Sequence, residues 1–112
     1  MKQQRLNAYR IMWLFVMFDL PTNTKSERKK AQGFRKKLMK DGFMMKQFSV
    51  YIRHCSSSEN ADVHTNRVKD MLPPEGKVSI IRITDKQFEG INNFWGIKAT
   101  EPRKAPLQME MF

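Results

Sequence analysis

The chain has 112 residues, of which 40% are hydrophobic and 29% charged, and its formal net charge is +10. This length suits one domain with a modest core. Cys55 is the only cysteine, which excludes an intrachain disulfide and a thiolate metal cluster within one chain. No apolar run approaches the roughly 20 residues of a membrane span, and the N-terminus lacks a signal-peptide pattern. We therefore expect a cytoplasmic protein with no membrane partner.

The positive charge is concentrated in one half of the chain. Residues 1–56 hold 13 Lys/Arg against 3 Asp/Glu, whereas residues 57–112 hold eight of each. This asymmetry predicts a basic face, which attracts phosphate backbones through counterion release. A solubilising charged helix surface is the alternative interpretation.

The first expected element is a strand from about Tyr9 to Phe18. Its apolar run is closed by Asp19-Leu20-Pro21, a pattern typical of a strand buried on both faces. Asp19 then lies at the rim of the core, where a charge needs a partner. A turn residue that accepts backbone amides and a metal ligand are equally good interpretations. One carboxylate is a poor magnesium site, but a symmetric dimer would bring two copies of Asp19 together.

A helix is predicted from about Lys25 to Lys40. It begins at the capping box Thr24-Lys25-Ser26-Glu27 and stops at Asp41-Gly42. A core stripe at helical spacing consists of Ala31, Phe34 and Leu38.

Two basic triads on this helix lie seven residues apart, which stacks them on one side at about 10.5 Å. Phosphate contact and a solvated face are equally good interpretations of them. The six candidate nucleic-acid-binding residues are Arg28, Lys29, Lys30, Arg35, Lys36 and Lys37.

Residues 43–53 have a strand-like alternation. One face would carry Met44, Phe48, Val50 and Ile52, and the other Met45, Gln47, Ser49, Tyr51 and Arg53. The periodicity fits one bent strand or two strands broken near Gln47-Phe48.

A second helix is predicted over residues 59–72, with an N-cap in residues 56–58 and an end at Pro73-Pro74. Its rough apolar stripe consists of Val63, Val68, Met71 and Leu72. A last strand follows over Lys77 to Thr84. Neither His54 nor His64 stands in a metal-ligand motif, so we expect both to be surface or partly packed histidines.

The C-terminal part has two expected segments. Residues 98–105 have the composition of a linker, and residues 107–112 alternate apolar and polar types. The alternating segment is either a strand added to the sheet of a second copy or a frayed terminus.

The order of elements predicts an α+β fold, with a ferredoxin-like βαββαβ sandwich as the leading case. Two helices would cover one face of the sheet. Residues 1–97 would form this domain, and residues 98–112 the linker and an extra C-terminal strand on a partner sheet.

The chain resembles the small CRISPR-associated spacer-acquisition family Cas2. The matching features are Phe18-Asp19 at the end of the apolar strand, Glu27-Arg28-Lys29-Lys30, Lys40-Asp41-Gly42-Phe43 and Gln47-Phe48-Ser49-Val50-Tyr51. Residues 76–78 and 84–88 are similar to the version found in type II systems. The resemblance covers residues 9–90 well and the tail loosely.

This resemblance implies a homodimer that sits between dimers of the larger CRISPR integrase subunit and holds the duplex destined to become a spacer. It also implies a possible role of Asp19 as a Mg²⁺ ligand, because some members are described as magnesium-dependent endonucleases on RNA or DNA. The family's arginine pair near the start of the first helix is matched only approximately, by Arg28 and Lys29.

Two functions follow as hypotheses. The favoured one is architectural: a homodimer binds double-stranded DNA and bridges integrase subunits. The alternative is enzymatic: paired Asp19 carboxylates hold magnesium for phosphodiester cleavage, with Ser49 and Tyr51 as substrate-orienting residues. A generic RNA-binding domain is a weaker third interpretation, because paired strand aromatics for base stacking are missing.

Overall fold

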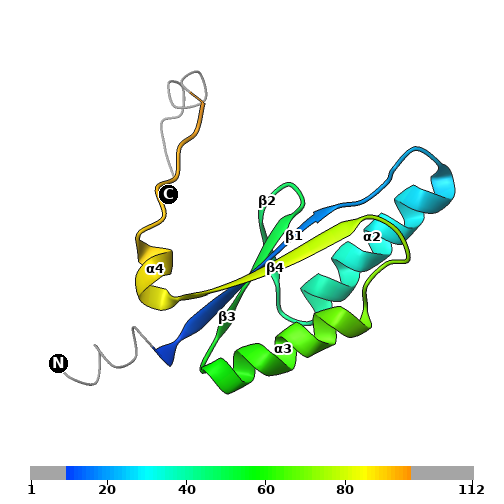
Figure 1. Ribbon diagram of the computed structural model, residues 1–112. Coiled ribbons are helices and arrows are strands. Elements are labelled where there is room, and N and C mark those ends of the chain that lie inside the picture. The colour runs from blue at the N-terminus through cyan, green and yellow to red at the C-terminus, as the bar shows by residue number, and fades with distance from the viewer. Residues whose placement is uncertain (1–9, 97–112) are drawn as a thin grey trace.

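The computed structural model describes residues 10–96 and shows a four-stranded antiparallel sheet with two long helices (Figure 1). The elements in chain order are β1 (Met12–Asp19), α2 (Lys25–Lys40), β2 (Met44–Gln47), β3 (Val50–Cys55), α3 (Ser58–Asp70), β4 (Lys77–Thr84) and α4 (Asp85–Glu89). The strand order is β2-β3-β1-β4. Order and topology confirm the predicted ferredoxin-like α+β fold. The expected linker and C-terminal strand of residues 98–112 lie outside the described residues.

β1 is a central strand, paired with β3 on one side and β4 on the other. Its alternate residues Leu14, Val16 and Phe18 are buried and pack against Phe34 and Leu38 of α2. Trp13, Phe15 and Met17 point to the opposite face and are only half-buried. The prediction of a strand buried on both faces was therefore wrong, because both long helices cover the same face of the sheet.

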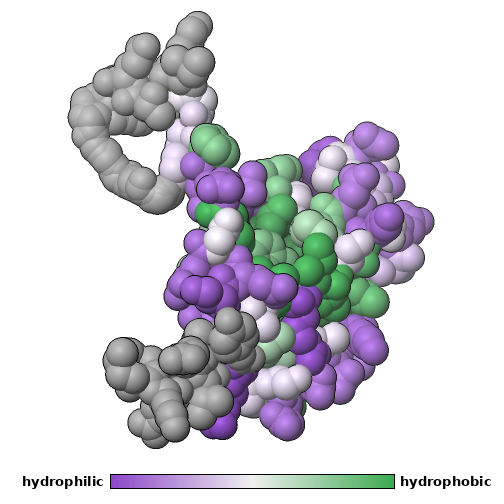
Figure 2. Space-filling view, turned by 60° about the vertical axis from the view of Figure 1, so that its left-hand side comes forward, coloured by the Kyte–Doolittle hydropathy of each residue, from purple (hydrophilic) through white to green (hydrophobic). Residues whose placement is uncertain are grey.

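The face of the sheet opposite to these helices carries an apolar row. The register places Met44, Ile52, Phe15 and Ile81 side by side, one from each strand. Met44 is 63% and Ile81 44% exposed. Figure 2 likewise shows hydrophobic residues gathered at the centre of one face of the molecule, with hydrophilic residues around them. This row is called the open apolar face below.

Residues 43–53 form two strands rather than one bent strand. The break falls at Phe48 and Ser49, and Ser49 has a left-handed φ of 65°. The carbonyl of Ser49 accepts a hydrogen bond from the amide of Phe18 at 3.1 Å. The β2–β3 turn is thereby fixed beside the end of β1.

The expected apolar stripe of α3 is only half right: Val68 is buried and Met71 packs against the core. Its buried residues are Ala61, His64 and Val68, whereas Val63 and Leu72 are exposed. The apolar residues alone did not identify the buried face of α3. That face also contains the small Ala61 and His64, whose ring contacts the Asp41 carboxylate. His64 is only 4% exposed, so it is a core residue rather than a surface one.

α4 was not expected from the sequence, although Thr84 and Gln87 form a capping box around its first turn. Phe88 of α4 stacks on Trp13, with ring centroids 3.8 Å apart. The indole nitrogen of Trp13 donates to the Asp85 carboxylate at 2.6 Å. α4 therefore covers one end of the open apolar face. Within residues 10–96, no helix has the length and apolar character that a bilayer span requires.

Candidate nucleic-acid interface

α2 carries eight basic residues and one acidic residue in sixteen positions. The acidic residue, Glu27, is used at the helix N-terminus, where its carboxylate accepts from the amides of Asn23 at 2.8 Å and Thr24 at 3.0 Å. The Thr24 hydroxyl accepts from the Glu27 amide in return. This capping box was predicted, and it leaves the rest of the helix without a neutralising carboxylate of its own.

The helical repeat sorts the six predicted cations into three rows, because residues seven apart lie nearly two turns along the same line. Arg28 and Arg35 share one flank, Lys30 and Lys37 the other, and Lys29 and Lys36 the outer ridge. The buried stripe of Ala31, Phe34 and Leu38 faces the sheet, so the cations wrap the whole solvent side of the helix. This arrangement is broader than the single stacked side that the spacing predicted.

The lysines of α2 are exposed and remain free to meet a ligand. Among residues 10–96, the ion pairs involve Arg67 and His64 with Asp41 and Arg82 with Asp62, all outside α2. Exposed lysines without fixed partners are suited to phosphate contacts that release counterions. The exposed lysines among the six candidates are Lys29, Lys30, Lys36 and Lys37.

The two arginines of α2 have more structured surroundings. Arg28 donates to the carbonyls of Thr22 at 3.1 Å and Asn23 at 3.3 Å, so it braces the loop before the helix. Arg35 is half-buried, and its guanidinium carbon lies 5.7 Å from the ring centroid of Phe18 and 5.1 Å from that of Phe48. No local pattern distinguishes Arg28 and Arg35 from the lysines beside them, so this difference was not predicted.

Asp19 ends β1 with an exposed side chain and pairs in register with Lys77 of β4. The described part of the chain contains no group of three His, Cys, Asp or Glu side chains that would hold a metal ion. Magnesium takes six oxygen ligands and is usually held by one or two carboxylates together with waters and phosphates. Residues 10–96 of one chain therefore do not fit a preformed magnesium site at Asp19.

The two candidate substrate-orienting residues have different environments. Ser49 is half-buried in the β2–β3 turn, close to the end of β1. Tyr51 is 3% exposed, and its ring stacks near Phe18 at 5.8 Å between centroids. The structure thus brings Ser49 to the Asp19 end of the sheet and packs Tyr51 into the core. Their proposed role in orienting a substrate stays a prediction.

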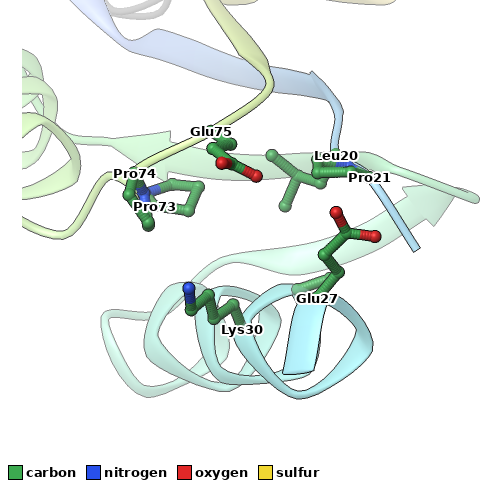
Figure 3. Close-up of a pocket in the computed structure, with 8 residues that line it drawn as sticks. Leu20, Pro21, Glu27, Lys30, Pro73, Pro74 and Glu75 are labelled. Atoms are coloured by element: carbon green, nitrogen blue, oxygen red, sulfur yellow. The ribbon is translucent and has the colours of Figure 1, made fainter. Parts of the chain in front are cut away.

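A small pocket lies at the same end of the molecule, between the β1–α2 loop, α2 and the α3–β4 loop (Figure 3). Leu20, Pro73 and Pro74 give it apolar walls, while Glu27, Glu75 and Lys30 supply charges. Two carboxylates against one ammonium make this pocket unfavourable for a phosphate. The candidate interface is therefore the outer surface of α2 rather than this pocket.

A partly buried polar cluster joins the two long helices and was missed from the sequence. The Asp41 carboxylate lies 2.8 Å from Nδ1 of His64 and accepts from Arg67 at 2.9 Å. Burial alone would raise the pKa of Asp41, but the hydrogen bonds from His64 and Arg67 hold that pKa below its ordinary value. Nε of Arg53 also donates to the Asp41 carbonyl at 2.7 Å. Asp41 was predicted only as the stop of the first helix, which the structure confirms, with φ of 95° at Gly42.

Cys55 and His54 have structural surroundings at the end of β3. Burial raises the pKa of the Cys55 thiol, which disfavours the reactive thiolate. The His54 ring lies edge-on to Trp13, with centroids 5.2 Å apart. His54 is exposed, which agrees with the expectation of a surface or partly packed histidine.

The chain matches the family model described as CRISPR associated protein Cas2 over residues 12–91. A protein of Flavobacterium psychrophilum named CRISPR-associated endoribonuclease Cas2 is 55% identical over 108 residues, covering 96% of this chain and 94% of that protein. A protein of the same name from Paracidovorax avenae is 49% identical, covering 96% and 99%.

A solved structure described as a crystal structure of Cas2 matches with a TM-score of 0.56 at 20% identity. It covers 90% of this chain and 99% of that chain, and at this identity the likeness concerns the fold alone. The family match and the two relatives confirm the resemblance found in the sequence. The chain belongs to the CRISPR-associated Cas2 family.

Proposed function

We propose that this protein acts in CRISPR adaptation as a homodimer that binds duplex DNA along its α2 helices and bridges subunits of the larger integrase. The single observation that carries the proposal is α2: eight cations, and one carboxylate that is used in capping. A charged surface of this kind binds the phosphate backbone and reads no base sequence. That property suits a protein that must accept spacers of any sequence.

The open apolar face supports the dimer. A row of apolar side chains from all four strands, with Met44 63% and Ile81 44% exposed, is unusual for a surface that stays in water. Packing two such faces together is the common solution for sheets with one uncovered side. A dimer formed in this way keeps α2 of each copy on the outside, because α2 covers the opposite face of the sheet.

The charge contribution can be tested with Lys29→Gln, Lys36→Gln and Lys37→Gln combined. The matched control removes three exposed lysines from outside α2, at Lys69, Lys77 and Lys86. Fluorescence anisotropy against salt should show a clear loss of duplex affinity and a flatter salt dependence for the α2 variant, by up to about one unit of slope per lost phosphate contact. Equal effects of the two triple variants would contradict the proposal.

A metal-dependent endonuclease is the second candidate function. The relatives from Flavobacterium psychrophilum and Paracidovorax avenae are named endoribonucleases, and Asp19 is an exposed carboxylate near the basic helix. Within residues 10–96, no group of three His, Cys, Asp or Glu side chains could hold a metal ion, so this activity would need Asp19 from two copies, with substrate or water oxygens.

The test is cleavage of single-stranded RNA and of duplex DNA by the purified protein with and without Mg²⁺. Asp19→Asn should abolish Mg²⁺-dependent cleavage and leave duplex affinity nearly unchanged, because the α2 cations remain. Asp62→Asn serves as a control for the loss of an exposed carboxylate. Equal cleavage by the Asp19 variant would remove Asp19 from the proposed chemistry.

A further inference from the structure

Arg35 differs from the other arginines between residues 11 and 96 in having no acceptor. Arg28, Arg53, Arg67 and Arg82 all donate to carbonyl, hydroxyl or carboxylate oxygens. No hydrogen bond or ion pair of Arg35 is found within the described residues, and its buried Nε is unpartnered. The side chain is held instead between the rings of Phe18 and Phe48. Its guanidinium is thus positioned while its charge remains uncompensated.

Phe48 is the second member of this site. Its side chain is 79% exposed, so most of the ring faces solvent. One side of the ring is occupied by Arg35 at 5.1 Å. The backbone is held by the left-handed Ser49 and by the hydrogen bond from the Phe18 amide to the Ser49 carbonyl. An aromatic ring is therefore presented to solvent from a fixed position.

The charges around the ring indicate which ligand it would meet. Residues 42–56, which include Phe48, contain no Asp or Glu, and the cation that contacts the ring is Arg35. An exposed aromatic ring beside an unpaired guanidinium favours a ligand that has both flat apolar surfaces and negative charge. Unpaired nucleotides have this combination, since bases stack on aromatic side chains while basic groups follow the backbone.

We propose that Phe48 and Arg35 form a binding site for one unpaired nucleotide, whose base stacks on the free side of the Phe48 ring and whose phosphate accepts from the guanidinium of Arg35. The inference deepens the proposed function and rests on it. The site adjoins the residue before Asp19, through the Phe18–Ser49 hydrogen bond. It would thus receive a single-stranded extension of a duplex held on α2.

The experiment compares three DNA probes by fluorescence anisotropy at one ionic strength. The first is a blunt duplex, the second the same duplex with a short single-stranded extension, and the third carries abasic sites throughout that extension. The second and third probes have the same charge and differ only in the bases. Extensions of both polarities are measured.

Phe48→Ala should weaken binding of the extended duplex at least about fivefold, the lower end of base–aromatic stacking, and leave the blunt and abasic probes unchanged. Phe48→Leu should behave like Phe48→Ala, because it keeps apolar bulk but lacks a ring. Phe48→Trp should retain wild-type binding. Val63→Ala, an exposed apolar truncation on α3, is the control with no expected effect.

Unchanged binding of the extended duplex by Phe48→Ala, or equal weakening on all three probes, would overturn the inference while duplex binding by α2 stands. Loss of binding to the integrase subunit with extension binding intact would overturn it too, in favour of a protein contact. Absence of wild-type binding to every probe at low salt would end both the inference and the proposed function.

Discussion

At the scale of single residues, Asp41 has the largest structural role that the sequence did not reveal. Its carboxylate joins His64 and Arg67 of α3 to the end of α2, and its carbonyl accepts from Arg53 of β3. The Asp-Gly pair predicted only the end of the helix. The partners of the Asp41 carboxylate lie 23 and 26 positions further along the chain, and such distant contacts leave no local signal in the sequence. For the same reason, the local sequence did not show that His64 belongs to the core.

Asp41→Asn should lower the free energy of unfolding by about 1–3 kcal/mol at neutral pH, since it weakens hydrogen bonds to a largely buried charge. The pKa of Asp41 is lower in the folded state than its ordinary value of 3.8. The carboxylate therefore stabilises the fold above that pH, and the contribution is lost as pH falls through the folded-state pKa. Urea unfolding of both proteins across this range should show the difference shrinking on acidification.

The control for this measurement is Asp62→Asn, which breaks the ion pair with Arg82 on a side chain that is 63% exposed. An exposed pair contributes less than about 1 kcal/mol. Equal stability losses at the two positions, or a difference between wild type and Asp41→Asn that grows on acidification, would contradict the role given to Asp41.

At the scale of elements, the sequence predicted those segments that carry both a periodic pattern and a boundary signal. α2 and β4 have the expected bounds because a capping box and an Asp-Gly stop delimit the first and a β-branched run defines the second. α4 has a capping box but only five residues, too few to show helical periodicity. In α3, length and N-cap were predictable, but the buried face depended on Asp41 from another element.

Alanine substitutions at two glycines test the backbone conformation of these elements. One substitution should raise the free energy of unfolding and the other should lower it. Gly33→Ala should raise the free energy of unfolding by up to about 1 kcal/mol, because it lies inside α2 and an added Cβ meets nothing within 4 Å. Gly76→Ala should lower it by about 1–3 kcal/mol. Gly76 has φ of +95°, and its Cβ would lie 2.7 Å from Leu20 Cδ2 and 2.8 Å from the Asp19 carbonyl oxygen.

Denaturant unfolding of the two alanine variants beside wild type checks both signs in one series. Gly76 lies where β4 begins, against the end of β1, so the substitution there also probes how tightly the Asp19 end of the sheet is built. Stabilisation by Gly76→Ala would show that the α3–β4 loop is not held against β1 as described.

At the scale of the whole molecule, the fold separates two surfaces by chemistry. The cationic side of α2 lies on one side of the sheet and the open apolar face on the other. The sequence predicted the fold and the basic helix, because alternation and charge are local properties. It did not predict the open apolar face, because the burial of Trp13 and Phe15 depends on which side of the sheet the two helices cover. The Phe48–Arg35 contact was missed for a similar reason, as its two residues come from different elements.

The measurement that tests the central proposal most directly is the composition of the DNA complex by sedimentation velocity, with separate signals for protein and labelled blunt duplex. We predict that free protein sediments as a dimer and that each complex holds two protomers per duplex. Ile81→Lys, which places a charge on the open apolar face, should yield monomers with reduced duplex affinity. A monomeric wild-type protein that binds the duplex as one protomer, with affinity unchanged by Ile81→Lys, would contradict the account.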